Sequence, residues 1–247
     1  MKKALLVLGF IASLVFASPS PAIYAVVTVD GNNDFPPAAL VDPDGGDTEF
    51  GPIDLGDIFI ANDGTNLYIG YGHDHDGWGG VQVGIAIDCK PGGGNDDPWG
   101  RRIDFVGGFG PDFVAYTNID SDWEDLVEWN NPNFGWNYNG GLNSLGWVQN
   151  TPFDEVAIPF SKINPGLECG QHILIEMWIT QDNCNKGPLD LMFNDPLQLS
   201  TPGGTIWELP CDGSQDVQLG QAFLYTIACW PTASEASSWG TIKALFK

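Results

Sequence analysis

Large aliphatic side chains recur at every second position along several short segments of this 247-residue chain. In residues 81–88, valine and isoleucine occupy the odd positions, and polar or small residues lie between them. A period of two places such side chains on one face of a β-strand, because successive side chains of a strand point to opposite sides. The pattern predicts a strand with one buried face, and it returns at residues 67–71, 156–160 and 173–179.

Further strands are expected at residues 57–61, 101–106, 112–119 and 220–228. The turn-forming stretch 62–66 predicts that strand 57–61 forms a hairpin with the strand after it, since its glycine can take positive φ. Only residues 122–129 and 234–246 show the helical spacing of apolar residues. With 32 glycines and 18 prolines between short strands, the predicted fold class is all-β, an antiparallel β-sandwich.

The first residues have the layout of an export signal. Two lysines precede an apolar run over residues 4–17, and the small residues Ala22 and Ala25 offer two cleavage sites. The run is shorter than the roughly 20 apolar residues of a membrane-spanning helix. We therefore expect a signal peptide over residues 1–25, with cleavage after Ala22 as the alternative.

The chain after the signal shows no linker or internal repeat that would divide it. One β-sandwich domain over residues 26–230 is expected, followed by a C-terminal tail over residues 231–247. The tail has two basic residues and no acidic residue after Glu235. It resembles the endings of some secreted bacterial proteins, which implies recognition by a cell-surface sorting or anchoring machinery.

Net charge excludes several classes of partner. The formal net charge is −23, and removal of the signal with its two lysines makes it −25. Such an anionic surface repels phosphate backbones and anionic lipids, so no nucleic-acid partner is expected. No segment after the signal has the length and apolarity of a membrane span. The expected location is secreted or extracytoplasmic, in the periplasm or at the cell surface.

All five cysteines follow the signal, and an exported protein meets an oxidising compartment in which disulfides persist. Because five is odd, one thiol should stay unpaired. A bond between Cys169 and Cys184 is disfavoured, since an extended strand would hold them roughly 30 Å apart. Two other pairings remain open: Cys89 with Cys184, and Cys211 with Cys229.

Three short segments carry a resemblance to a known family. Residues 29–31, 54–58 and 62–69 contain an opening Asp-Gly, an acidic strand start and an Asp-x-x-Asn-Leu-Tyr motif. Together they resemble the opening of the family 9 carbohydrate-binding modules and their DOMON-like relatives. The resemblance covers the first third of the chain. It implies an immunoglobulin-like or jelly-roll-like sandwich that binds sugars and structural calcium.

A stretch rich in tryptophan and asparagine is the candidate ligand site. Indole rings stack on the apolar faces of sugars, while neighbouring amides and carboxylates bind the hydroxyls. The candidate contacts are Trp123, Trp129, Trp136, Asn130 and Asn137. Trp147 lies in the same stretch. The alternative is that these rings pack beneath loops, because tryptophan is highly buried on average, and packing is the expectation for Trp178.

Two further segments are candidates for metal binding. One glycine-rich loop gathers four acidic residues whose oxygens would suit Ca²⁺, although the spacing is not that of an EF-hand. These candidate ligands are Asp42, Asp44, Asp47 and Glu49. A solvated acidic loop is the alternative. His73 and His75 share one face of a strand, but a transition metal needs three or four ligands, so a surface turn is the preferred interpretation there.

The chain contains no recognisable catalytic motif, neither a nucleophile elbow nor a zinc-protease signature. Glycoside hydrolysis requires two carboxyl groups, one of them protonated. Glu176, in an apolar strand, is the best acid, but its pairing with Glu155 or Asp190 would be arbitrary. The preferred function is a secreted, non-catalytic carbohydrate-binding protein with calcium as candidate cofactor. A cell-surface structural or adhesive protein is the alternative, and a glycoside hydrolase is the least favoured.

Overall fold

The computed structural model describes residues 22–43, 53–119, 123–130, 135–138, 153–183, 185–193 and 216–230. Its strands are β1 (Leu40–Asp42), β2 (Asp54–Asn62), β3 (Asn66–Asp74), β4 (Val81–Asp88), β5 (Ile103–Phe105), β6 (Phe113–Asn118), β7 (Glu124–Asn130), β8 (Gly135–Tyr138), β9 (Phe153–Pro159), β10 (His172–Gln181), β11 (Asp190–Leu191), β12 (Val217–Leu219) and β13 (Phe223–Thr226). Two short helices, η1 (Pro37–Ala39) and α1 (Phe160–Ile163), complete the described elements. The predicted all-β fold is confirmed.

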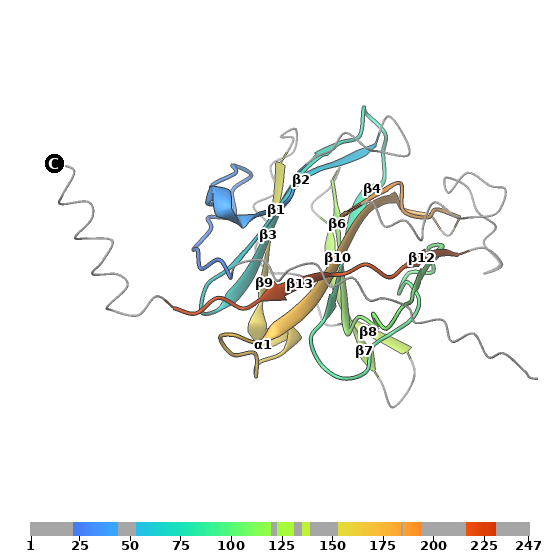
Figure 1. Cartoon of the computed structure of the whole chain (residues 1–247). Coiled ribbons are helices and arrows are strands. Elements are labelled where there is room, and N and C mark those ends of the chain that lie inside the picture. The colour runs from blue at the N-terminus through green and yellow to red at the C-terminus, as the bar shows by residue number, and fades with distance from the viewer. Residues whose placement is uncertain are drawn as a thin grey trace, which may run out of the picture.

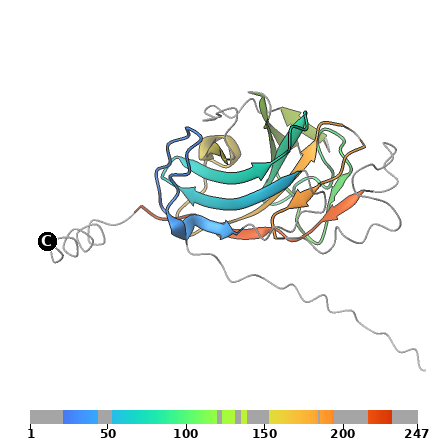
Figure 2. The same ribbon diagram turned by 90° about the horizontal axis from the view of Figure 1, so that it is seen from above.

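Two antiparallel sheets pack face to face as a sandwich (Figures 1 and 2). The small sheet has the order β1-β2-β3-β9. The large sheet has the order β11-β10-β4-β6-β7-β8, and β13 also pairs with β10. A separate parallel pair, β5 with β12, lies outside the large sheet.

The core between the sheets is built from the alternating side chains that the sequence predicts. Val83, Ile85 and Ile87 of β4 are wholly buried there, against Ile69 of β3 and Ile158 of β9. Their contribution is hydrophobic burial, which depends on area rather than on direction.

Polar contacts also cross this core. The Tyr71 and Thr117 hydroxyls share a hydrogen bond between the sheets. The Asp190 carboxylate accepts a hydrogen bond from the Leu55 N–H (2.8 Å). Because burial of an unpaired polar group is costly, these bonds fix how one sheet is placed on the other.

Both sheets are also covered on their outer faces, which corrects the expectation of one buried face per strand. The N-terminal segment covers the small sheet, where Phe35 packs on Phe59 and Phe153. The segments carrying β5 and β12 cover the large sheet on the opposite side of the molecule (Figure 1). As a result the outward-facing Gln82 and Ala86 of β4 are as buried as its inward-facing residues.

The predicted hairpin of residues 57–61 with the next strand is confirmed, since β2 and β3 pair in an antiparallel manner. The reason differs from the one expected, because Gly64 does not have positive φ. Instead the Asp63 carboxylate accepts hydrogen bonds from the Thr65 and Asn66 N–H groups (2.6 and 2.7 Å). A side chain that bonds the backbone two residues on is sufficient to form such a turn.

The helical spacing of residues 122–129 was misleading, because residues 124–130 form strand β7. Leu126 points into the core between the sheets, whereas Val127 belongs to the outer cluster. A strand buried on both faces loses its strict alternation, and its apolar residues then mimic a helical period. The second helical segment, 234–246, and the tail 231–247 lie outside the described residues.

One disulfide joins Cys169 to Cys229, so the predicted pairing of Cys211 with Cys229 is wrong. The register of the large sheet explains the bond. His172, at the start of β10, lies opposite Thr226, at the end of β13, which brings the flanking cysteines together. Cys89 has a free thiol, so its predicted bond to Cys184 is also wrong. Burial and the nearby Asp112 raise the pKa of that thiol to about 12.

Residues near the predicted signal cleavage sites pair with the sandwich. The Ala25 N–H donates to the Asn62 carbonyl, and the Asn62 N–H donates to the Ile23 carbonyl (both 3.0 Å). Cleavage after Ala22 retains these bonds, whereas cleavage after Ala25 removes them. The predicted signal otherwise lies outside the described residues, and no helix within the described ranges has the length and apolarity of a membrane span.

Candidate functional site

The outer face of the large sheet carries the main polar cluster of the described chain. Trp178 of β10, Gly84 of β4, Tyr116 of β6 and Asp125 of β7 lie side by side in one row across four strands. Neighbouring residues on the same face of paired strands are close enough to interact directly. The row therefore brings an indole and a phenol together beneath the loop that carries Asp97 and Trp99, called the covering loop below.

Gly84 makes this arrangement possible. A Cβ atom at that position would lie 2.2 Å from the Trp178 ring, so only glycine leaves room for the indole to lie across β4. The Trp178 Nε1–H then reaches the Tyr116 hydroxyl oxygen (3.0 Å). Trp178 is wholly buried, which confirms the expectation that it packs.

The covering loop adds a buried carboxylate to the row. The Tyr116 hydroxyl donates to Asp97 Oδ2, and Asp97 Oδ1 accepts hydrogen bonds from the Trp99 and Arg101 N–H groups (2.9 and 3.0 Å). Burial and the negative charge of Asp97 hold the pKa of the Tyr116 phenol well above its usual range. Tyr116 thus remains a neutral hydrogen-bond donor, and Asp97 fixes the loop in place.

A buried arginine balances this carboxylate. The Arg101 side chain is only 2% exposed, and its guanidinium lies 4.0 Å above the Tyr116 ring. It donates to Gln82 and also to Asp182 (3.2 Å), a carboxylate whose side chain is 68% exposed. A planar cation stacked on an aromatic ring and bonded to carboxylates is a rigid arrangement. Arg101 therefore joins the interior of the cluster to its solvent-exposed edge.

An aromatic platform lies above this network. Trp99 packs edge-on against Tyr116 (centroids 4.9 Å apart) and edge-on against Trp123 (6.1 Å). Trp123 is 38% exposed, and the Trp123 carbonyl accepts a hydrogen bond from the Asn118 N–H (3.0 Å). We use the name Trp99–Trp123 platform for Trp99 and Trp123 together with Asn118, whose backbone is bonded to Trp123, and Asp182, which Arg101 binds.

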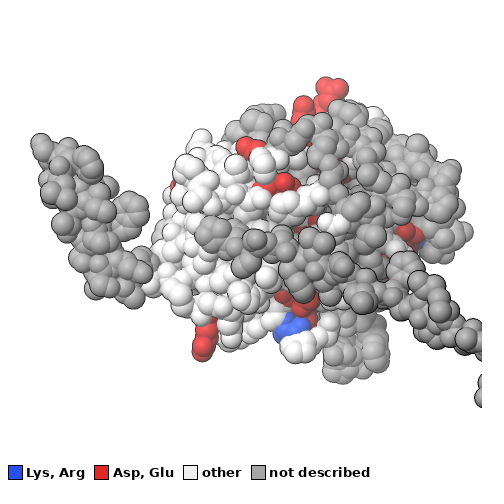
Figure 3. Space-filling view, viewed as in Figure 1, with Lys and Arg blue, Asp and Glu red and all other residues white. Residues whose placement is uncertain are grey.

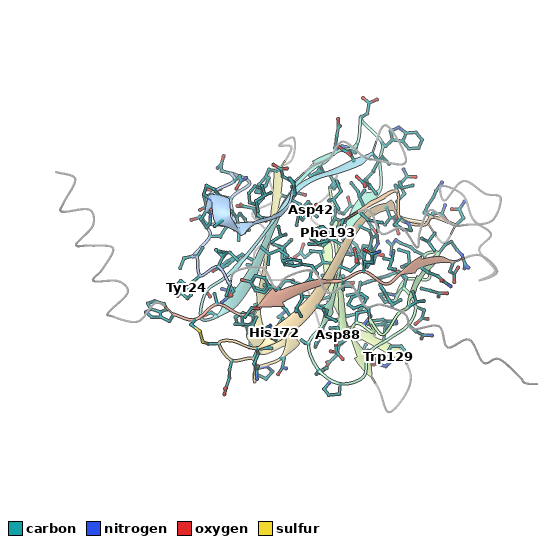
Figure 4. The ribbon with its side chains drawn as sticks, in the orientation of Figure 1. Tyr24, Asp42, Asp88, Trp129, His172 and Phe193 are labelled. Carbon is teal, nitrogen blue, oxygen red and sulfur yellow. A yellow bond between two sulfur atoms is a disulfide. The ribbon has the colours of Figure 1, made fainter. Side chains whose placement is uncertain are left out.

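The platform brings together only part of the predicted ligand site. Trp129 and Trp136 pair across β7 and β8 with centroids 5.2 Å apart, and both rings press on Gly94. Trp123 immediately precedes β7 and Trp129 lies six residues further along, so extended chain separates them by about 20 Å. The predicted indole contacts are therefore divided between two ends of the outer face, and Figure 4 shows Trp129 at one of these ends.

Of the predicted amide ligands, Asn137 does not join either group. Asn137 lies opposite Glu128, one position out of phase with the Trp129–Trp136 pair, so it is on the other face of the sheet. Asn130 lies in β7 opposite Gly135, and Trp147 lies outside the described residues. On the outer face Asn118, which the sequence did not single out, is bonded through its backbone N–H to the carbonyl of the exposed Trp123.

The predicted calcium loop is described only at its start. Asp42 Oδ2 accepts a hydrogen bond from the Phe193 N–H (2.8 Å), and Figure 4 shows the two residues close together. The other candidate ligands, Asp44, Asp47 and Glu49, lie outside the described residues. Within the described ranges no three His, Cys, Asp or Glu side chains already surround one metal position. Calcium binding at this loop stays a prediction.

The three carboxylates considered for glycoside hydrolysis lie on different faces. Glu176 is wholly buried on the outer side of the large sheet, in register with Ala86. Glu155 is on the outer side of the small sheet, where it accepts hydrogen bonds from the Asp30 and Gly31 N–H groups (both 2.9 Å). Asp190 points between the sheets. Neither Glu155 nor Asp190 therefore forms an acid–base pair with Glu176.

The motif that carried the family resemblance has a structural role. Asp63 closes the turn after β2 and accepts a hydrogen bond from the Tyr68 hydroxyl (2.8 Å), and Asn66 donates to that hydroxyl (3.2 Å). Asp30 and Gly31 are held by Glu155. These residues stabilise the small sheet, and none of them belongs to the Trp99–Trp123 platform.

Two segments far apart in the sequence meet beside the buried cluster. The Arg102 N–H donates to the Lys186 carbonyl (2.9 Å), and the Thr180 hydroxyl donates to the Gly187 carbonyl (2.8 Å). Residues 92–101 and 186–191 are therefore neighbours, although more than 80 positions separate them in the chain. Paired arginines at 101 and 102 in a strongly anionic chain were the one sequence signal that marked this region.

Neither a scan against protein-family models nor a search of curated proteins finds a match to this chain. Function is therefore inferred from the geometry of the chain itself. On the face shown in Figure 3, the described surface carries scattered acidic side chains and few basic ones. A neutral ligand suits such a surface better than an anionic one.

Proposed function

We propose that this protein is an exported, non-catalytic carbohydrate-binding protein and that the Trp99–Trp123 platform is its sugar-binding surface. The observation that carries the proposal is an exposed indole, Trp123, held in a fixed position at the edge of a buried hydrogen-bonded network. An indole presents a large apolar face together with one polar N–H group, which suits it to a surface that binds a ligand with both kinds of group. Export of the chain is part of the proposal, and the Cys169–Cys229 disulfide is consistent with it.

The platform has the two kinds of group that sugar recognition requires. The indole faces supply apolar area for the C–H groups of a pyranose ring. The Asp182 carboxylate and the Asn118 amide supply hydrogen-bonding partners for hydroxyl groups. Because Arg101 and Asp97 fix the carboxylate and the loop beforehand, little conformational entropy is lost when a ligand binds.

The experiment is a glycan array with the exported chain, followed by calorimetry on the best ligand with and without Ca²⁺. Trp123→Ala is expected to lower the affinity by about tenfold or more, because it removes the exposed stacking surface. Trp230→Ala is the matched control, since Trp230 is 71% exposed but follows β13 and packs edge-on against Tyr24. Its affinity should equal that of the unaltered protein.

Three results would contradict the proposal. Absence of binding to any oligo- or polysaccharide would remove the carbohydrate function and favour the structural or adhesive alternative. Unchanged binding after Trp123→Ala, combined with loss after Trp136→Ala, would move the site to the Trp129–Trp136 pair at the other end of the outer face. Release of reducing sugar from a bound glycan would instead indicate an enzyme.

A further inference from the structure

A buried histidine and a buried aspartate face each other at the end of β3. His73 Nε2 lies 3.5 Å from Asp154 Oδ2, and each side chain is only 4% exposed. Asp154 belongs to β9 and is in register with Tyr71, so it lies diagonal to His73 on the same face of the small sheet. Two residues more than 80 positions apart in the sequence are thus held together by strand pairing.

Neither group satisfies its hydrogen-bonding capacity. Both ring nitrogens of His73 and the Oδ2 atom of Asp154 are buried without a hydrogen-bond partner. A buried polar atom without a partner costs free energy, and native proteins tolerate few of them. One common explanation for such a site is an ion or a water molecule between the two groups.

The separation of the two atoms suits a shared metal ion. Ligand atoms bound to a tetrahedral Zn²⁺ ion at 2.0 to 2.2 Å are about 3.3 Å from one another. The His73–Asp154 distance of 3.5 Å is close to that value. An imidazole nitrogen and a carboxylate oxygen are also ligands that Zn²⁺ and related divalent ions accept.

A second imidazole is at the required distance. The His75 ring is centred 5.8 Å from the His73 ring, and the two residues share one face of the chain. Two imidazoles on one tetrahedral ion have ring centres about 5 Å apart, by the same bond lengths. His75 is half-buried at the start of a turn in which Gly77 and Gly80 have positive φ (75° and 70°). The three side chains do not yet surround one position, so His75 must turn toward the His73–Asp154 pair to become the third ligand.

We propose that His73, His75 and Asp154 bind one divalent transition-metal ion, with Zn²⁺ the first choice, and leave a fourth position for water. The site is independent of the sugar-binding platform, which lies on the outer face of the other sheet. It is also distinct from the calcium prediction, because Ca²⁺ selects oxygen ligands. The two histidines are neighbours in the sequence, and the pairing of β3 with β9 adds the Asp154 carboxylate as a further ligand.

The test is titration of the metal-stripped, exported chain with Zn²⁺, and with Co²⁺ for its visible absorption, in the presence of excess Ca²⁺ and Mg²⁺. Excess Ca²⁺ and Mg²⁺ occupy the acidic surface and leave the histidine site available. We expect one equivalent of Zn²⁺ to bind and to raise the thermal unfolding temperature, since a ligand that binds only the folded state stabilises it. Co²⁺ should give an absorption spectrum of a nitrogen- and oxygen-ligated ion.

Three variants assign the site. His75→Ala alters a half-buried residue and should fold normally, yet it should lower the Zn²⁺ affinity at least about tenfold. Asp154→Asn should do the same, with folding checked by circular dichroism. His172→Ala is the control, because His172 is exposed at the start of β10 and bonded to Thr226 (2.9 Å) at the disulfide-bonded end of that strand (Figure 4). It should bind Zn²⁺ as the unaltered protein does.

Absence of stoichiometric binding under these conditions would overturn the proposal and leave a simple His73–Asp154 ion pair. Binding that survives both His75→Ala and Asp154→Asn would also overturn it, because the ion would then be held elsewhere on the acidic surface. Neither result bears on carbohydrate binding, so the two proposals fail or succeed separately.

Discussion

The two faces of the large sheet are made by the same strands, yet they are stabilised in different ways. The inner face of β4 carries Val83 and Ile85, which pack among other aliphatic side chains. The outer face of the same strand carries Gln82 and Gly84, which serve a hydrogen-bonded cluster. Hydrophobic packing tolerates exchange among side chains of similar volume, whereas a buried polar network requires each partner. The difference predicts that similar substitutions have unequal effects on the two faces.

The largest effect is expected for Arg101→Met on the outer side. The substitution retains much of the volume but leaves the Asp97 carboxylate buried without its counter-charge (Nη1 to Oδ1, 3.7 Å). Removal of one partner of a buried ion pair costs about 4 kcal/mol in the free energy of unfolding. Met177→Leu, on the inner side of β10, is the matched exchange and should cost less than about 1.5 kcal/mol. Both are measured by urea denaturation.

A double variant sharpens this comparison. Adding Asp97→Asn to Arg101→Met removes the stranded charge, so it should recover a part of the lost stability. If Arg101→Met and Met177→Leu reduce the free energy of unfolding equally, the outer cluster is not a coupled network and the contrast between the faces disappears.

A smaller effect is expected for Gly84→Ala. The added methyl group would overlap the Trp178 indole, and overpacking of this kind costs about 2 kcal/mol. Gly64→Ala is the control, because a Cβ atom at Gly64 meets no atom within 4 Å. In a Trp178→Leu background the Gly84→Ala penalty should shrink. An undiminished penalty in that background would show that the clash with Trp178 is not its cause.

The smallest effect concerns Asp88, the last outer-face residue of β4. Burial, and then the negative charge of Asp112, raise the pKa of Asp88 to about 6. Between pH 4 and pH 6 the folded state keeps this proton while the unfolded state releases it, so the free energy of unfolding falls as pH rises through this window. Because Asp88 is half-exposed, the change is discounted to on the order of 1 kcal/mol.

Asp88→Asn isolates this contribution, because an amide does not titrate. The variant should be more stable than the unaltered protein at pH 7.5 by that amount and should match it near pH 4. Urea denaturation at the two pH values measures the difference. Equal pH profiles for both proteins would mean that Asp88 is not the group responsible.

The interior between the sheets was predictable to a large extent, and the outer site was not. Alternation located β3, β4, β9 and β10 and identified the inner aliphatic residues, because the period of two is a local property of a strand. The same criterion failed at β7, where Leu126 and Val127 are buried on opposite faces. It also failed to indicate that Asp97 and Arg101 are buried, because they precede β5 and no alternation of apolar residues around them reports burial.

The candidate site, too, was predictable from the sequence only in part. Tryptophan content identified Trp123 as a candidate contact, but the sequence grouped it with Trp129 and Trp136 because they are close along the chain. In a strand, residues close in sequence lie far apart in space, since each residue advances the chain by about 3.3 Å. The partner of Trp123 is Trp99, which reaches it from a loop 24 positions earlier in the sequence.

The sequence by itself determined most of the long strands, the inner core, the β2–β3 hairpin and the strong negative charge, because each depends on composition or on short-range pattern. Only the tertiary structure decided which strands are neighbours. That choice set the Cys169–Cys229 bond, the row of Trp178, Gly84 and Tyr116, and the approach of Asp154 to His73. The physical reason is that strand pairing and register depend on burial across the whole domain, and distant residues meet only after that register is fixed.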